Sequence, residues 1–430
     1  MAPTLDTPLD LPCGARISNR LCKVALTEGL ADPMNRATER LERLYRAWSL
    51  GGAGLVITGN VQVDRTHLER PGNVVVDGNG GLDRLRAFAA AGRTAGNHLW
   101  MQINHPGRQT SREMNAHPLA PSAVALDIPD DAFGPPREAT ETEILDVIGR
   151  FARVARTARE TGFSGVQIHA AHGYLISQFL SPIANRRADA WGGRLENRAR
   201  LLLEIVAAVR GAVGRDFPVA VKLNSADFQA GGFTHEEAVR VARWLGEAGV
   251  DLLELSGGTY EQMVMVGAGE GAASAPAKES TRRREAYFLD HAALIKPQAQ
   301  MPVMVTGGFR TRAGMMAALA SGAADVIGLG RPMCTHTDLP QGLLNGALAR
   351  VPAWENELRL APGELPADAE AEMRLRVEAL GKQGWFCLQL IRMGEGLAPD
   401  LTMSLTEALH AYAQSEARTA ERLQLADHHI

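Results

Sequence analysis

GVQIHAAHGYLISQFLSPIANRRADAWGGRLENR, residues 165–198, is the stretch from which the fold and the site of this chain can be worked out. Its first residues, 166–168, form a short run that is rich in β-branched side chains and too short for a helix, so they predict a buried strand. Three polar ring side chains follow where this strand ends: His169, His172 and Tyr174. One stretch therefore supplies both a sheet element and a candidate site.

The chemistry of these three side chains points to a carbonyl-containing ligand. Imidazoles are nearly neutral at pH 7 and can donate hydrogen bonds to a carbonyl oxygen. A phenol, with a pKa near 10, can release a proton without being a strong acid. Two carbonyl donors and one weak acid suit the reduction of a carbon–carbon double bond that is conjugated to a carbonyl group.

A metal site is the alternative interpretation of the two histidines. The zinc-protease pattern needs histidines at i and i+4 on a helix with an adjacent Glu. Here only Ala170 and Ala171 separate the histidines, so we expect no metal at this position.

The same segment carries a family resemblance. HAAHGYL, QFLSP, the Asn185-Arg186 pair and WGGRLENR resemble the active-site segment of the Old Yellow Enzyme family of FMN-dependent ene-reductases. The resemblance implies FMN as the cofactor, NADH or NADPH as the electron donor and a small activated alkene as the substrate. It further implies that His169 and His172 bind the activating group of the substrate and that Tyr174 donates the proton.

Composition excludes several other classes of protein. The 430 residues are 45% apolar and 22% charged, which is normal for a globular protein, and a net charge of −4 gives no case for nucleic acid. No run of 18 apolar residues predicts a membrane span, and MAPTLDTPLDLP lacks the features of a secretory signal. The four cysteines form no Cys-x-x-Cys pair, which argues against a structural zinc or an iron–sulfur cluster and fits a cytoplasmic location.

Along the chain, strand-length apolar runs alternate with helical patterns eight times. Such alternation predicts an α/β protein with a parallel sheet, and eight repeats favour a closed (β/α)8 TIM barrel. We expect the barrel to span residues 1–348 and a C-terminal helical extension, not an independent redox domain, to span residues 349–430. The expected strands are 21–26, 54–58, 99–103, 166–169, 219–223, 252–255, 302–305 and 326–329.

Helix signals support this division. Thr140-x-x-Glu143 and Thr234-x-x-Glu237 are capping boxes that predict helix starts after the third and fifth strands. The first of these helices has an apolar face and should end near Gly162.

Functional residues of a barrel lie at the carboxyl ends of its strands, and this chain has polar or glycine-rich segments there. Gly307-Gly308 and Gly330-Arg331 follow the last two strands, where barrels commonly bind phosphate through backbone N–H groups and an arginine fork. Tight turns alone would also explain the glycines. The other strand ends carry Thr27, the QINHPGRQ segment with Gln102, Lys222, Asn224 and SGGTYEQ (256–262).

The family resemblance assigns cofactor roles to these ends. WSLGGAGLVITG, QINHPGRQ and PLAPSAV match the family well, and the resemblance covers roughly residues 11–348. It implies that Gln102 bonds the pyrimidine edge of the flavin, that the phosphate lies at Gly307, Gly308, Gly330 and Arg331, and that Ala25, Leu26 and Thr27 lie beside the ring. Thr27 falls where the family tunes the flavin potential. The second strand supplies either Gly59 or Asn60.

Lys222 is the departure from the family pattern, because the family usually has an arginine beside flavin N1 there. A lysine supplies the same charge without the fork of a guanidinium, so we expect Lys222 to take over this role. Lys222 also supports the main rival hypothesis, a Schiff-base aldolase. Two further hypotheses are a barrel that binds a ligand without turnover and a flavin reductase of quinones, nitro compounds or oxygen.

The C-terminal segment has a different character. It contains a charged helical pattern, an apolar segment GWFCLQLIRMGEGL and a final cap at Ser404-x-x-Glu407. Its simplest interpretation is a helical extension that packs on the barrel. A sharper hypothesis is that Trp385 and Phe386 dock on a neighbouring subunit or close the active site. By analogy with the family we expect a homo-oligomer, most simply a dimer.

Overall fold

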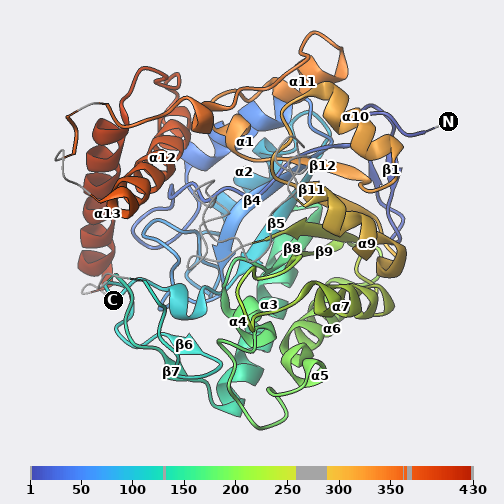
Figure 1. The fold of residues 1–430 in the computed structure, drawn as a ribbon, viewed down its shortest axis with the longest axis vertical. Helices are drawn as coiled ribbons and strands as arrows, with labels where there is room; N and C mark the ends of the chain where they lie inside the picture. The colour runs from blue at the N-terminus through green and yellow to red at the C-terminus, as the bar shows by residue number, and fades with distance from the viewer. Residues whose placement is uncertain (1, 129–131, 258–287, 362, 366–369, 428–430) are drawn as a thin grey trace.

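A closed barrel of eight parallel strands organises the chain (Figure 1). The computed structural model describes residues 2–128, 132–257, 288–361, 363–365 and 370–427. The predicted (β/α)8 TIM barrel is confirmed. In order around the barrel, its strands are β3 (Leu21–Lys23), β4 (Leu55–Gln62), β5 (His98–Asn104), β8 (Gly165–Ala170), β9 (Val219–Asn224), β10 (Leu252–Ser256), β11 (Val303–Thr306) and β12 (Val326–Leu329).

Two strands differ clearly from their predicted bounds, whereas the other six agree within one residue at each end. The strand β3 ends at Lys23 instead of residue 26. The next residue, Val24, still donates its backbone N–H to Leu329 O on β12. The strand β4 continues to Gln62 because a bulge between Ile57 and Asn60 shifts its register on β5 and lets the pairing resume. Both deviations lie at the carboxyl end of the barrel.

Helices surround the barrel, and the predicted caps are confirmed. Thr140 and Thr234 each form a complete capping box with the glutamate three residues on. Among the described helices, none combines the length and the hydropathy that a membrane span requires. The helices that follow the successive barrel strands are α1 (Glu39–Leu50), α2 (Leu82–Ala91), α3 (Glu141–Glu160), α6 (Arg200–Val213), α7 (His235–Glu247), α9 (Leu289–Ala299), α10 (Arg312–Ala320) and α11 (Leu339–Leu344).

The interior of the barrel is apolar at its amino end and polar at its carboxyl end. A hairpin of β1 (Leu9–Asp10) and β2 (Arg16–Ile17) closes the amino end over a buried apolar cluster that includes Trp100, Ala220 and Leu252. Two residues further along the same strands, and therefore on the same inward face, the chain places Gln102, Lys222 and Glu254. The barrel is therefore a packed core that carries a polar layer on top.

Two long helices, α12 (Ala371–Gly394) and α13 (Leu405–Asp427), pack side by side, and α12 also packs against α1 (Figure 1). The predicted cap of the last helix is present, since Ser404 and Glu407 exchange hydrogen bonds. Trp385 is fully buried and donates to Met403 O, and Phe386 is also buried. The hypothesis that these two rings dock on a neighbouring subunit is therefore wrong, because the protomer already covers them itself. The alternative, that they close the active site, stays a prediction.

Candidate active site

The three ring side chains singled out from the sequence lie together at the end of β8. The ring centroids of His169 and His172 are 5.1 Å apart, and those of His169 and Tyr174 are 4.8 Å apart, both in edge-to-face geometry. His169 is 3% exposed and Tyr174 is 5% exposed. The strand end thus gathers two imidazoles and a phenol in one cluster, in which His169 and Tyr174 are buried and His172 is half-buried.

A tight turn after β8 produces this arrangement. His172 has a φ of 62° and Gly173 a φ of 77°, so the chain reverses through two successive left-handed residues. The side chain of Asn224, at the end of β9, accepts a hydrogen bond from the His172 backbone N–H at 3.0 Å. Tyr174 then caps the amino end of α4 (Leu175–Leu180). The neighbouring strand therefore holds the turn that presents all three rings.

Burial favours the neutral form of both imidazoles, and hydrogen bonds fix their orientation. The Ala171 backbone N–H donates to His169 Nδ1 at 3.2 Å, which leaves the proton of the neutral ring on Nε2. His172 Nε2 lies 2.8 Å from Ser256 Oγ. Burial, followed by the nearby positive charge of Lys222, lowers the pKa of both histidines well below the usual value. The pair can therefore offer N–H groups without carrying a charge.

Below these rings, the polar layer forms one continuous chain of contacts. Gln102 Nε2 donates to Gln167 Oε1 at 2.7 Å, and Gln167 Nε2 donates to Glu254 Oε2 at 2.8 Å. The other carboxylate oxygen, Glu254 Oε1, lies 3.0 Å from Lys222 Nζ and accepts a hydrogen bond from Thr306 Oγ1 at 2.8 Å. Two residues predicted to contact the cofactor, Gln102 and Lys222, are thus connected through a carboxylate.

The ends of β3 and β4 meet beside this layer. Thr27 Oγ1 donates to Asn60 Oδ1 at 3.2 Å, and Asn73 donates to the same oxygen at 3.1 Å. Gly59 instead donates its N–H to Glu28 and Tyr45, and a Cβ on Gly59 would lie 2.1 Å from Glu28 Oε2. Asn60 is therefore the residue of the two that joins the Thr27 side of the barrel end. Ala25 and Leu26 are half-buried next to it.

The glycine-rich ends of β11 and β12 lie next to each other in the barrel. Gly307 and Gly308 have φ values of 113° and 84°. Residues with a Cβ rarely adopt such positive φ values, whereas glycine does so readily. After β12, Gly330 leads into Arg331, whose guanidinium lies 3.9 Å from Glu355. Glycine backbone and an arginine thus follow two adjacent strands, and both are groups that can bind a phosphate.

The residues present fit an FMN molecule at this end of the barrel. No described residue donates to Gln102 Oε1, so this buried side chain retains an acceptor for a ring N–H. Among the described residues, Lys222 has Glu254 as its ion-pair partner and retains further N–H donors. The ring edge of FMN alternates hydrogen-bond donors and acceptors, and Gln102 and Lys222 offer groups that can pair with it. The ends of β11 and β12 offer groups that can bind its phosphate.

Sequence reasoning missed two polar residues of the site, Gln167 and Glu254, and gave no role to Asn224 or Ser256. A signal existed for the first two, because Gln167 and Glu254 stand two residues before polar residues at strand ends and so share their inward face. From the predicted SGGTYEQ segment, residues 258–262 lie outside the described part of the chain.

A cluster of potential metal ligands lies elsewhere in the described part of the chain and does not include His169 or His172. It consists of Asp64, His67 and His105, whose ligand atoms lie within 4.8 Å of one another. These groups already have partners in the protein, since His67 Nδ1 lies 3.0 Å from Asp64 and Gly107 N–H donates to His105 Nδ1. These hydrogen bonds therefore hold the loops that follow β4 and β5 in place.

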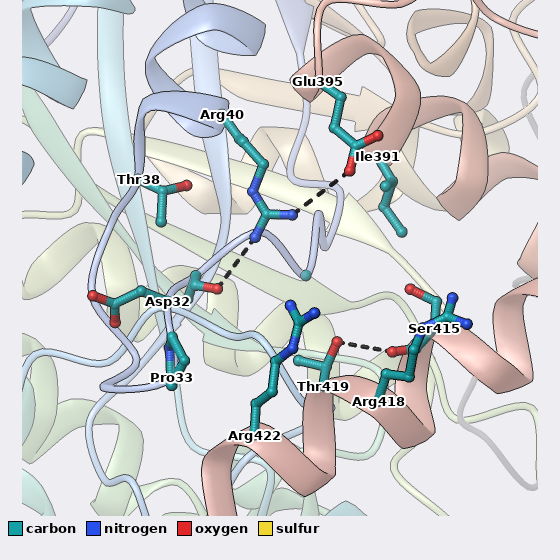
Figure 2. Close-up of a pocket in the computed structure, with 12 residues that line it drawn as sticks. Asp32, Pro33, Thr38, Arg40, Ile391, Glu395, Ser415, Arg418, Thr419 and Arg422 are labelled. Carbon is teal, nitrogen blue, oxygen red and sulfur yellow. Dashed lines mark hydrogen bonds and ion pairs between the residues drawn. The ribbon is translucent and has the colours of Figure 1, made fainter. Parts of the chain in front are cut away.

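A hollow of about 340 Å³ lies outside the barrel, between the loop after β3 and the helices α12 and α13 (Figure 2). We call it the outer hollow. Its lining is polar, and Arg40 lies 3.9 Å from Glu395 across it. Arg418 and Arg422 are exposed and make no ion pair with the described residues. Its lining residues are Gly29, Ala31, Asp32, Pro33, Thr38, Arg40, Ile391, Glu395, Ser415, Arg418, Thr419 and Arg422.

Known flavin oxidoreductases resemble this chain over the length of its barrel. Residues 4–347 match the model of the NADH:flavin oxidoreductase / NADH oxidase family. The chain is 38% identical over 353 residues to the NADH-dependent flavin oxidoreductase iliE of Neonectria sp., and the match covers 78% of this chain but 46% of that protein. It is 35% identical over 424 residues to the NADH-dependent flavin oxidoreductase nadA of Aspergillus parasiticus, covering 95% of this chain and 89% of that protein.

A solved structure is similar in fold as well as in sequence. The old yellow enzyme homologue from Zymomonas mobilis superposes with a TM-score of 0.69 and 25% sequence identity, over 84% of this chain and 98% of that one. The match with the first relative spans about half of that relative's length, whereas the matches with the other two extend over most of both chains.

Proposed function

The chain belongs to the NADH:flavin oxidoreductase / NADH oxidase family, which confirms the resemblance to the Old Yellow Enzymes, and from this premise we propose that it reduces activated alkenes. The reaction is the reduction of a C=C bond conjugated to a carbonyl group, with NADH or NADPH as the electron donor. The observation that carries the proposal is the cluster of His169, His172 and Tyr174, two neutral imidazoles with a phenol beside them.

Bound FMN supplies a carrier that accepts a hydride from the nicotinamide and passes it to the alkene. The protein groups that would hold it are Gln102 and Lys222 at the ring, Thr27 and Asn60 beside it, and Gly307, Gly308, Gly330 and Arg331 at the phosphate. The protein contributes orientation, charge compensation and exclusion of water.

His169 and His172 bind the carbonyl oxygen of the substrate. Hydride addition to the β-carbon places negative charge on that oxygen, and preorganised N–H donors stabilise such charge. Neutral rings suit this role because each still donates one N–H to a carbonyl oxygen and brings no uncompensated charge into the buried site. His169 has its Nε2–H available for this purpose, since its Nδ1 already accepts the Ala171 N–H.

Tyr174 supplies the proton that the α-carbon then needs. A phenol is a weak enough acid to stay protonated at neutral pH and still release a proton to a carbanion-like centre. Its ring lies edge-to-face against His169, so donor and carbonyl clamp hold fixed positions relative to each other. The substrate would therefore be bound by two side chains and protonated by a third.

The aldolase hypothesis is weaker in light of the geometry. A Schiff base requires a free neutral amine, and Lys222 instead lies 3.0 Å from Glu254 in a buried ion pair. A quinone, nitro or oxygen reductase would use the same cofactor groups without Tyr174. A homodimer and a cytoplasmic location remain predictions.

An anaerobic absorption experiment tests the proposal. The purified protein is reconstituted with FMN and titrated first with NADH or NADPH and then with cyclohexenone. We expect the flavin absorbance to bleach with the nicotinamide and to return with the enone. Bleaching without return would replace the proposal with a reductase of quinones, nitro compounds or oxygen, and failure to bind FMN would reject it.

A further inference from the structure

Glu254 is a carboxylate that no role in the proposed reaction explains. It has no exposed surface and stands on β10 at the heart of the polar layer. A buried carboxylate is costly unless charge and hydrogen bonds compensate it. Here the compensation comes from Lys222, Thr306 and Gln167, at 3.0, 2.8 and 2.8 Å. Each of these contacts is with a donor, and one of the donors is the predicted cation at the flavin.

Glu254 also fixes the orientation of two amides. An ionised carboxylate only accepts, so Gln167 must turn its NH₂ toward Glu254 and its carbonyl oxygen toward Gln102. Gln102 must then turn its NH₂ toward Gln167, which leaves its own Oε1 as the free acceptor. The direction of the whole chain of amides therefore follows from the charge at its far end.

We propose that Glu254 is a positioning residue of the cofactor site, which balances the charge of Lys222 and sets the amide orientation of Gln102. This inference rests on the proposed function, because it assumes that both residues contact FMN. A lysine without a partner at this position would act on the ring with its full charge. In this chain a carboxylate 3.0 Å away offsets much of that charge.

The substitution Glu254→Gln tests both parts. It preserves the shape of the side chain but removes the negative charge, so Lys222 becomes an uncompensated cation. We expect reduced FMN to be favoured over oxidised FMN by at least tenfold relative to the wild type, which raises the two-electron midpoint potential by at least about 30 mV. The readout is the midpoint potential from an equilibrium titration with reference dyes, not turnover.

The amide orientation has its own readout. A glutamine at 254 that still accepts from Lys222 and Thr306 would present its NH₂ to Gln167, reverse both amides and remove the free acceptor on Gln102. We expect the Kd of the apoprotein for FMN to rise at least tenfold. The substitution Gln167→Leu removes the hydrogen bonds that connect Gln102 to Glu254 but leaves the charges of Lys222 and Glu254. It should therefore weaken FMN binding and change the midpoint potential less than Glu254→Gln does.

Thr306→Val is the matched control. It removes a donor to the same carboxylate oxygen without changing any charge. We expect the ratio of reduced to oxidised FMN and the Kd for FMN each to change less than threefold. A Glu254→Gln protein whose potential and FMN affinity both equal those of the wild type would overturn the inference. If the wild type itself does not bind FMN, the proposed function fails, and that outcome is distinct.

A second comparison covers the case in which Glu254→Gln does not fold. Lys222→Gln alone leaves the buried carboxylate uncompensated, whereas Lys222→Gln with Glu254→Gln removes the pair. The potential of the double variant should lie closer to the wild type than that of the single variant. Equal potentials in the two variants would show that Glu254 does not act through the charge of Lys222.

Discussion

The carboxyl end of the barrel and the outer hollow both set cations beside carboxylates, but water reaches only one of them freely. In the barrel, the side chains of Lys222 and Glu254 are 5% and 0% exposed and lie 3.0 Å apart. In the outer hollow, those of Arg40 and Glu395 are 36% and 47% exposed and lie 3.9 Å apart (Figure 2). Exposed pairs contribute between zero and 1 kcal/mol, roughly, whereas removing one partner of a buried pair costs several.

Charge alone does not mark a functional site in this molecule. The outer hollow has more arginines, but its guanidinium groups keep their hydration. In the polar layer of the barrel end, Lys222 lies among described residues that hold one another in place by hydrogen bonds and an ion pair. We therefore expect substitutions at the barrel end to have large effects and those in the outer hollow to have small ones.

The largest expected effect is that of Tyr174→Phe. The variant keeps the ring that packs against His169 but loses the proton donor, so enone reduction should slow by about 10²–10⁴-fold. NADH oxidation in the first half-reaction should keep its rate, because it needs no proton from the phenol. Stopped-flow measurement of each half-reaction separates the two. Equal enone rates in variant and wild type would exclude Tyr174 as the donor.

Arg70→Met should produce the next largest effect, on stability. Arg70 forms a bidentate ion pair with Glu416 of α13 and donates to Thr27 O, and its side chain is 7% exposed. Its loss leaves a partly buried carboxylate without its cation, with only the Tyr412 hydroxyl still donating to it at 3.5 Å, and should lower the unfolding free energy by about 3 kcal/mol. Urea denaturation measures this. The variant Arg70→Met with Glu416→Gln should recover part of the loss, and a double variant no more stable than Arg70→Met would contradict the pairing.

A smaller effect should appear in the pH dependence of stability. Burial and Lys222 hold the pKa of His169 and His172 below the unfolded value, so below about pH 6.5 the unfolded chain binds protons that the folded chain does not. The unfolding free energy should therefore fall as the pH drops from 6.5, by up to about 1.4 kcal/mol per pH unit for each histidine. Replacing both by Asn should reduce this slope without removing it, because burial also lowers the pKa of His98, His105 and His291. The same slope in wild type and variant would mean that these rings are not buried in the neutral form.

The barrel could be predicted from the sequence because its signals are local. Each strand is a short apolar run, and a four-residue capping-box motif predicts the helix starts at Thr140 and Thr234. The ends of β3 and β4 could not be predicted. The end of β3 depends on how far its neighbouring strands provide backbone hydrogen-bond partners, and the end of β4 depends on a bulge. Neither feature can be recognised in the apolar sequence of the strand.

The candidate site divides in the same way. The cluster of His169, His172 and Tyr174 lies within six residues of sequence, so a single motif reveals it. Glu254 was not found because an acid in a strand is usually solvent-facing, and only the register in which β10 pairs with β9 places it beside Lys222. Trp385 was misjudged for a related reason, since the chain that buries it, near Trp354 and Met403, comes from other segments.

The smallest expected effect is that of Arg422→Ala in the outer hollow. The side chain is exposed and makes no ion pair with the described residues, so the unfolding free energy should change by less than about 0.5 kcal/mol. Enone reduction should keep its kcat/KM within about twofold. Saturation kinetics with NADH, NADPH and the enone provide the check. A KM that rises for one nicotinamide and not for the enone would break the comparison, because hydrated arginines would then be binding a phosphate of the donor.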